Sequence, residues 1–392
     1  MQSQVIAIGI QWTDCQKPSY LPGKMRILFV VCGEGLGHAS RSTKLAKYLE
    51  RFGHTCYFAS YGKASEFISR QGFTVFETYR EVILEGESGY FSLSKTVWSS
   101  KGVLLSLARS LRDIRRIIIE KKIDVLVADT MYAAVFAAKL QDIPSLFITN
   151  QNKFASANDE HSKHWEILSS VVEKYLTLPD NVIVPDFSYP NTVSAYNLEI
   201  KREEAHRYKF VGPIMDARLS DYNIEKKTIF ASFGGEPFKL PMYRMLKEIA
   251  NERPYHQFDV FATSPGLPEE SRNFKTHGYT DDILTYMAQS RVNILHGGLT
   301  SIHESLFLGK PVVMIIDPYH PEQWNNGRKI EEIGAGIMLS GDKVTKETLS
   351  DAIDEALNMK VPDMSYLFVQ EDGRVKAMAA IEEAVRNHKH KS

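Results

Sequence analysis

The chain has 392 residues, enough for two or three domains of ordinary size. Its 47 lysines and arginines nearly balance its 48 acidic residues, so the net charge of −1 provides no general basic field for nucleic-acid binding. No run of about 18 apolar residues predicts a membrane-spanning helix. The three cysteines, Cys15, Cys32 and Cys56, are too few and too scattered for a disulfide framework or a zinc site. We therefore expect a protein without nucleic-acid partners that works in a reducing, cytoplasmic setting.

Residues 1–24 are predicted to form an extension outside the fold. Residues 5–10 are apolar, but no basic segment precedes them and no cleavage site of small residues follows, which argues against a secretory signal. The stretch that follows is irregular and contains Pro18 and Pro22. Met25 then opens a clear strand, so we expect the folded part of the chain to begin there.

Residues 25–215 are predicted to form a first domain. Its expected strands are short, apolar and rich in β-branched residues, and they lie at 26–32, 55–59, 73–76, 123–128, 144–149 and 181–184. Amphipathic stretches between several of them predict helices at 40–52, 62–71, 101–121 and 131–141. Continuous apolar strands separated by helices indicate a parallel sheet that is covered on both faces.

The same alternation restarts after residue 222 and predicts a second domain over residues 216–365. Its expected strands lie at 228–233, 256–261, 291–295, 311–316 and 335–339, and its expected helices at 241–251, 281–289, 299–308, 322–332 and 345–358. Residues 211–218 resemble a linker, and residues 366–392 are predicted to hold a helix, at 366–389, that crosses back to the first domain. The predicted fold class is therefore α/β, with two Rossmann-like, doubly wound domains that face each other across a cleft.

The loop after the first strand holds a candidate catalytic histidine. Its three glycines, Gly33, Gly35 and Gly37, permit backbone conformations that a Cβ would prevent, and His38 follows at the start of a predicted helix. Ligands bind at the carboxyl ends of the strands in a doubly wound sheet, so His38 is predicted to act there as a general base. Asp129 ends another predicted strand and could orient the imidazole. The alternative is that both residues merely cap helices.

A second cluster of glycines and polar residues follows a strand of the second domain. Its members are His296, Gly297, Gly298, Thr300, Ser301 and Glu304. Thr300 and Ser301 open a predicted helix, where free N–H groups and the helix dipole suit a phosphate. Glu304 lies about one turn further and could accept hydrogen bonds from ribose hydroxyls. An ordinary strand–turn–helix connection, with threonine as the cap, is the alternative interpretation.

Two further elements are predicted to lie at the same donor-binding edge. Glu322 and Gln323 follow the next buried strand and could read the hydroxyls of a sugar, although a solvated helix start is the alternative. Gly234 and Gly235 follow the first strand of the second domain, at the carboxyl end where ligands bind.

Together these motifs resemble those of the GT-B glycosyltransferases, in particular the group with the MurG-type and UDP-glucosyltransferase enzymes. The stretch from Gly35 to His38 is similar to the glycine-rich acceptor loop with its catalytic histidine. The strand that ends at Asp129 is similar to the segment that orients that histidine. The pattern His-Gly-Gly-x-Thr-x-x-x-Glu that begins at His296, and Pro-Glu-Gln at 321–323, are similar to the nucleotide-sugar motif.

The resemblance implies an inverting transfer of a sugar to a hydroxyl acceptor from a nucleotide-diphosphate sugar, with UDP as the favoured nucleotide. Gly35, Gly37 and Arg41 would contact the acceptor, and the histidine and glycines of the second cluster would hold the phosphates. His296 occupies the position that carries a glutamate in many retaining enzymes, which favours inversion. No Asp-x-Asp triad ends a strand near the donor site, so no metal and no other cofactor is expected.

Three alternative functions stay open on the sequence. The loop with His38 and Arg41 also resembles that of PseG-type hydrolases, in which water replaces the sugar acceptor. The second cluster is also similar to that of UDP-sugar 2-epimerases, although the first loop lacks their usual Gly-Thr-Arg-Pro-Glu run. The third alternative is a non-catalytic nucleotide-sugar-binding subunit, which would not need His38 and Asp129 together at the cleft.

The class of the hydroxyl acceptor is open, and a lipid-linked acceptor is among the candidates. Residues 85–100 mix Gly and Ser with apolar and aromatic side chains and could form an acceptor wall. Residues 101–122 carry seven lysines and arginines against two acidic residues, a net charge of +5. One interpretation is a core helix with a solvated basic face. The other is that residues 85–122 make peripheral contact with anionic lipid, so that a cytoplasmic protein associates with the membrane.

Overall fold

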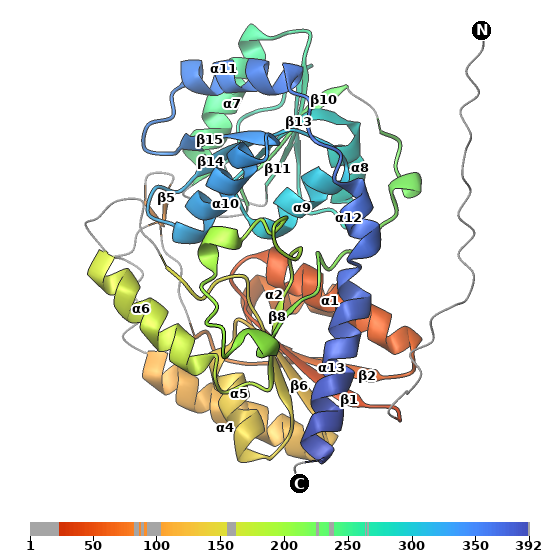
Figure 1. The fold of residues 1–392 in the computed structure, drawn as a ribbon. Coiled ribbons are helices and arrows are strands. Elements are labelled where there is room, and N and C mark those ends of the chain that lie inside the picture. Colours follow the sequence, from red (N-terminus) through yellow and green to blue (C-terminus); the bar gives the residue numbers. More distant parts are fainter. Residues whose placement is uncertain are drawn as a thin grey trace, which may run out of the picture.

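The computed structural model describes residues 23–81, 86–87, 90–91, 103–154, 162–224, 227–234, 239–262, 264 and 266–390. Figure 1 shows two sheets, one above the other, each flanked by helices. The predicted extension therefore lies almost entirely outside the described residues, as do Gly235 and most of residues 85–100. None of the described helices combines the length and the apolar character that crossing a bilayer requires.

Among the described residues, the first sheet has seven strands in the order β3-β2-β1-β6-β7-β8-β9, and every neighbouring pair is parallel. Its strands are β1 (Arg26–Val31), β2 (Thr55–Ser60), β3 (Val75–Glu77), β6 (Val125–Asp129), β7 (Ser145–Ile148), β8 (Asn181–Val184) and β9 (Tyr208–Phe210). The helices of this half are α1 (Leu36–Arg51), α2 (Gly62–Arg70), α4 (Val103–Lys121), α5 (Tyr132–Leu140) and α6 (Ser162–Tyr175). A separate antiparallel pair is formed by β4 (Gly86–Glu87) and β5 (Tyr90–Phe91).

The second sheet has six described strands in the order β12-β11-β10-β13-β14-β15, again all parallel. Its strands are β10 (Thr228–Ser232), β11 (Gln257–Phe261), β12 (Phe274–His277), β13 (Ser290–Leu295), β14 (Val312–Ile316) and β15 (Gly336–Ser340). Its helices are α7 (Leu240–Glu252), α8 (Ile283–Gln289), α9 (Leu299–Phe307), α10 (Pro321–Glu332) and α11 (Lys346–Asn358). Two such sheets confirm the predicted class of two Rossmann-like, doubly wound domains.

Each central strand is buried on both faces, as its continuous apolar sequence predicts. In β1, Ile27 and Phe29 join the apolar cluster on one face of the sheet, whereas Leu28 and Val30 join the cluster on the opposite face. This alternation follows from the two-residue period of a strand. The second sheet is built in the same way, and all five residues of β14 are buried.

The chain crosses between the two halves twice, and the two crossings touch. After the second sheet come α12 (Ser365–Gln370) and α13 (Gly373–Lys389), and α13 runs along the first half beside α1 (Figure 1). A Cβ on Gly212, in the first crossing, would lie 2.1 Å from the carbonyl oxygen of Glu371, and one on Gly373 would lie 2.5 Å from that of Pro213. Only glycine permits the two backbones to pack this closely.

The last helix belongs to the core of the first sheet. Ala377, Ile381 and Ala384 are almost fully buried in the same cluster as β1, and α13 contacts β7, β8 and α1. The prediction of a single helix at 366–389 is wrong in one respect, because the structure has two helices there. The break falls at the second crossing, where Asp372 caps α13 by accepting a hydrogen bond from the N–H of Arg374.

Other differences from the sequence prediction concern short or half-exposed elements. Helix α6 and the edge strands β9 and β12 were not among the predicted elements. Both edge strands are only three or four residues long and partly exposed, so their sequences lack a continuous apolar run. The helix predicted at 40–52 begins earlier, at Leu36, with Gly35 as its N-cap.

Candidate active site

The order of strands places one ligand-binding edge in each half. In the first sheet β1 lies between β2 and β6, and Val31 at the end of β1 pairs with Asp129 at the end of β6. In the second sheet β10 lies between β11 and β13, and Ser232 pairs with Leu295. Ligands of open α/β sheets bind outside the carboxyl ends of the strands at such reversals of strand order. The predicted site residues that the structure describes end or follow strands at these two edges.

The two edges face each other across the boundary between the halves. Helices α1 and α9, which begin at these edges, contact one another. A Cβ on Gly37 in the first turn of α1 would lie 3.2 Å from Oγ1 of Thr300 in the first turn of α9. Further along the same helices, Nζ of Lys44 lies 3.5 Å from Oε1 of Glu304. The predicted acceptor and donor residues therefore belong to one site.

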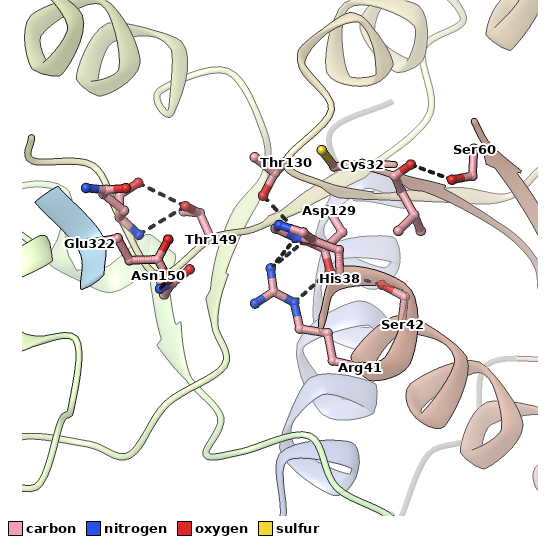
Figure 2. A network of polar contacts seen from close by, with 12 residues as sticks. Cys32, His38, Arg41, Ser42, Ser60, Asp129, Thr130, Thr149, Asn150 and Glu322 are labelled. Atoms are coloured by element: carbon pink, nitrogen blue, oxygen red, sulfur yellow. Dashed lines mark hydrogen bonds and ion pairs between the residues drawn. The ribbon is translucent and has the colours of Figure 1, made fainter. Parts of the chain in front are cut away.

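His38 and Asp129 form the dyad that their positions predict. Nδ1 of His38, in the first turn of α1, lies 2.7 Å from Oδ1 of Asp129 at the end of β6 (Figure 2). A carboxylate can only accept, so Nδ1 donates in this contact, and in the neutral imidazole the lone pair of Nε2 is left to accept another proton. Asp129 is fully buried, whereas the His38 side chain is 26% exposed. A buried carboxylate thus fixes the ring at Nδ1, while part of the ring remains accessible to solvent.

A third residue, Arg41, holds the carboxylate of the dyad. Its Nε donates to Oδ2 of Asp129 at 2.7 Å and its Nη2 to Oδ1 at 2.5 Å, which makes a bidentate pair. The hydroxyl of Ser42 donates to Oδ2 at 3.0 Å. Burial raises the pKa of the Asp129 carboxyl, but Arg41 and His38 outweigh it and hold that pKa well below its usual value. Arg41 was predicted to contact the acceptor, and that role stays a prediction beside the contact with Asp129.

On the donor side, His296 is neutral at physiological pH. Burial and the nearby charge of Lys239 lower the pKa of its imidazole to about 4. Among the described residues, the buried Nδ1 of His296 has no hydrogen-bond partner. Gly297 follows with a φ of 85°, a left-handed value that favours glycine, and packs against Gln323 and Ile316. A neutral imidazole can form a hydrogen bond to a phosphate, but it brings no charge.

Helix α9 supplies the rest of the predicted phosphate and ribose site. Its N-cap is Gly298, which has no side chain to bond the amides of the first turn, so these N–H groups are left for a ligand. Thr300 and Ser301 lie in that turn, and the Ser301 hydroxyl donates to the carbonyl of Gly298 at 3.0 Å. Glu304 is buried one turn further, beside Lys44 of the first half.

Glu322 and Gln323, predicted to bind the donor sugar, have hydrogen-bond partners in the structure. Oε1 of Glu322, in the first turn of α10, accepts a hydrogen bond at 2.9 Å from Nδ2 of Asn150 in the first half (Figure 2). Oε1 of Gln323 accepts from the N–H of Asp317 at 2.8 Å, and its Nε2 donates to Oδ2 of Asp317 at 3.3 Å. Glu322 therefore faces the acceptor half, whereas Gln323 is fixed within the donor half.

Sequence reasoning missed two groups of buried polar residues at this site. Lys239 and Asp317 form an ion pair beside His296, and they come from the segments that follow β10 and β14. Asn326 donates to the carbonyl of Gly297 at 3.0 Å and accepts from Nδ2 of Asn197 at 2.9 Å. No local motif identifies them, although Asp317 comes directly after a buried strand. Gly234, with a φ of 83°, lies at the same edge, and Gly235 is outside the described residues.

Metal-binding geometry does not occur in the described part of the chain. No group of three or more His, Cys, Asp and Glu side chains is placed there to hold an ion. The expectation that the reaction needs no metal stays a prediction.

Comparison with known proteins covers both halves. Residues 25–197 match the model for glycosyl transferase family 1, and residues 248–366 match the C-terminal domain of glycosyltransferase family 28. An uncharacterized glycosyltransferase of Methanosarcina acetivorans is 28% identical over 367 residues, covering 89% of this chain and 96% of the relative. The UDP-N-acetylglucosamine--N-acetylmuramyl-(pentapeptide) pyrophosphoryl-undecaprenol N-acetylglucosamine transferase of Finegoldia magna is 24% identical over 273 residues, 65% of this chain and 70% of that enzyme.

Solved structures agree with the sheet topology. The crystal structure of the kitacinnamycin glycosyltransferase superposes with a TM-score of 0.67 at 18% identity, over 93% of this chain and 100% of that one. At this identity the likeness shows the fold, and the family matches add the sequence relationship. The chain therefore has the GT-B glycosyltransferase fold, and its two halves match glycosyltransferase families 1 and 28.

Proposed function

We propose that this protein transfers a sugar from a nucleotide-diphosphate sugar, with UDP as the favoured nucleotide, to a hydroxyl acceptor by a single inverting displacement without a metal. The observation that carries the proposal is the 2.7 Å contact between His38 Nδ1 and Asp129, opposite the uncapped start of α9. That arrangement supports the proposal of a general base on the first half opposite a phosphate-binding helix on the second. The relative from Finegoldia magna, whose name includes a UDP-sugar and an undecaprenol-linked acceptor, supports both substrate classes.

In the proposed reaction each half has its own task. The acceptor hydroxyl loses its proton to Nε2 of His38 as its oxygen attacks the anomeric carbon, and the bond from that carbon to the diphosphate breaks with its electron pair on the leaving oxygen. Asp129 keeps the proton on Nδ1 and stabilises the imidazolium that forms. The amides at the start of α9 hold the diphosphate, Glu304 accepts from the ribose, and Glu322 and Gln323 face the donor sugar.

The alternative functions differ in their products. A hydrolase of the PseG type releases a free sugar, a 2-epimerase yields an epimeric nucleotide sugar, and a binding subunit yields nothing. The His38–Asp129–Arg41 arrangement favours the transferase or the hydrolase over a binding subunit, because a subunit that only binds has no use for an oriented base. Product analysis with and without candidate acceptors separates the four.

The donor site is tested by a thermal-shift panel of UDP-, GDP- and TDP-sugars on the wild type and on Glu304→Ala. A true donor stabilises the wild type by mass action. Loss of one charged hydrogen bond costs about 1.5–3 kcal/mol, so we expect Glu304→Ala to bind that donor about 10- to 150-fold more weakly. The control is Glu355→Ala, an exposed glutamate on α11 that should change nothing. Equal donor affinity in Glu304→Ala and the wild type would remove Glu304 from the ribose role.

The proposed acceptor includes lipid-linked hydroxyls, because one face of the first half suits a membrane surface. Helices α4, α5 and α6 lie together on that side (Figure 1). They expose large apolar side chains, namely Leu105, Ile119, Phe136, Leu140, Ile167, Leu168 and Val171. Four arginines of α4 are exposed beside them, at positions 109, 112, 115 and 116. Apolar anchors with a basic rim are typical of helices that lie on anionic lipid.

Vesicle co-sedimentation tests this contact. The wild type should bind vesicles of phosphatidylcholine with phosphatidylserine at low salt, and binding should fall as salt rises. Replacing Arg112, Arg115 and Arg116 by Gln should abolish it. The matched control replaces three exposed lysines of the second half, Lys275, Lys343 and Lys360, by Gln and should keep it. If the wild type does not co-sediment with anionic vesicles at low salt, the result would favour a soluble acceptor.

A further inference from the structure

A buried ion pair lies at the ligand-binding edge of the second sheet. Lys239 is 4% exposed and Asp317 is 3% exposed, and Nζ of the lysine donates to Oδ1 of the carboxylate. Lys239 is the N-cap of α7, after β10, and Asp317 comes directly after β14. Strands β10 and β14 are the two neighbours of β13, whose end carries His296. The pair therefore flanks His296 at the edge where the donor diphosphate is expected.

The fold alone does not explain this pair. Removing two charges from water costs free energy that their attraction only partly returns, and apolar residues of similar size often serve stability as well. Gln323 also fixes Asp317: its Nε2 donates to Oδ2 of the carboxylate, and its Oε1 accepts from the backbone N–H of Asp317. A fixed carboxylate in turn fixes the ammonium group that it bonds. The structure thus maintains a rigid, water-poor ammonium group, paired with one carboxylate, at one point of the edge.

A diphosphate leaving group needs such a charge. The bond that breaks joins the anomeric carbon to an oxygen of the diphosphate, and its electron pair stays on that oxygen as negative charge. His296 is neutral at physiological pH and cannot balance it. The dipole at the start of α9 supplies only a partial charge. A preorganised full charge in a site that excludes water stabilises the developing anion most strongly.

We propose that Lys239 is a catalytic residue that binds the β-phosphate of the donor and of the leaving diphosphate, and that Asp317 positions it. This inference rests on the proposed transferase function. An ammonium group has three N–H donors, so Lys239 can bond a phosphate oxygen and the carboxylate of Asp317 together. The lysine would then provide the charge that a metal ion provides in other enzymes of this chemistry.

The test compares nucleotide diphosphates with the matching monophosphates. Binding of UDP, GDP and TDP, and of UMP, GMP and TMP, is measured by titration calorimetry on the wild type and on Lys239→Met/Asp317→Asn. This double variant removes both charges together, so no buried charge is left without a partner. We expect its affinity for the best diphosphate to fall about 10- to 150-fold, the loss of one charged hydrogen bond. Its affinity for the monophosphate should change less than threefold, because the β-phosphate is absent.

Lys310→Met is the matched control. Lys310 is also a buried lysine, and it lies before β14 at the opposite end of the strand that Asp317 follows. This variant should keep the preference for the diphosphate. Lys239→Arg, which keeps the charge, should lose less affinity than the double variant.

Each outcome separates the inference from the function on which it rests. A folded double variant with an unchanged ratio of diphosphate to monophosphate affinity would overturn the role of Lys239 alone. Equal losses for both nucleotides would also overturn it, because they would indicate a structural role. A wild type that binds none of the three diphosphates would contradict the proposed function, and the inference with it.

Discussion

Replacing His38 by alanine is expected to lower kcat by about 10²–10⁴, the usual contribution of a positioned general base. The hydroxyl of the acceptor has a pKa far above 7, and this variant removes the base that we propose takes its proton. Donor affinity should stay within about twofold, because the donor residues lie on α9 and α10 in the other half. Steady-state kinetics with a verified acceptor, together with donor titration, measure both quantities.

Asp129→Asn is the companion variant, because it keeps the shape of the side chain and removes the charge. We expect an equal or smaller loss of kcat. Turnover of His38→Ala close to that of the wild type would refute the assignment of the base. The configuration of the product is an independent check by NMR: a single displacement inverts the anomeric centre, so a retained configuration would refute that mechanism whatever His38 does.

Arg41→Met is expected to have the largest effect on stability, about 3–5 kcal/mol. In the wild type Arg41 neutralises the fully buried carboxylate of Asp129 through two hydrogen bonds. Without it, burial raises the pKa of Asp129 above its unfolded value of about 3.9. When the folded pKa of a carboxyl is raised, the free energy of unfolding falls as pH rises. In the wild type the folded pKa is depressed, so Asp129 stabilises the folded protein above about pH 4. The difference in free energy of unfolding between the wild type and Arg41→Met should therefore be larger at pH 7.5 than at pH 5.

Urea unfolding at both pH values measures this difference. Arg51→Met is the matched control, since Arg51 lies on the same helix but pairs with Asp216 at the surface and is 59% exposed. An exposed pair of this kind contributes at most about 1 kcal/mol, and its loss should not depend on pH between 5 and 7.5. A small loss of stability in Arg41→Met, or one that grows toward pH 5, would contradict the role of Arg41 in neutralising Asp129.

The dyad could be predicted from sequence because it depends on local patterns. The apolar strands that end just before Gly33 and at Asp129 are long enough to be recognised, and parallel strands bring their carboxyl ends to one edge. The same reasoning placed His296 and Glu304 on the second edge. What strand patterns specify is the edge at which a residue lies.

Side-chain partners at those edges could not be predicted in the same way. Arg41 follows His38 by three residues, which puts both on one face of α1, but nothing in that spacing shows that Asp129 takes two bonds from the arginine. Lys239 and Asp317 are 78 residues apart, and a lone lysine beside a loop reads as a surface residue until its burial is known. Pairs of this kind depend on how the loops pack, which strand periodicity does not encode.

The return of α13 to the first sheet has a consequence for how the chain is made. Ala377, Ile381 and Ala384 complete the face of the sheet that β7 and β8 present, yet they come after every strand of the second half. During synthesis the first half therefore emerges with the part of one apolar face over β7 and β8 uncovered, and the second sheet can close before the first. Multidomain chains usually fold from the N-terminus as their domains emerge. Here the last helix must leave the ribosome before this face of β7 and β8 is shielded from water.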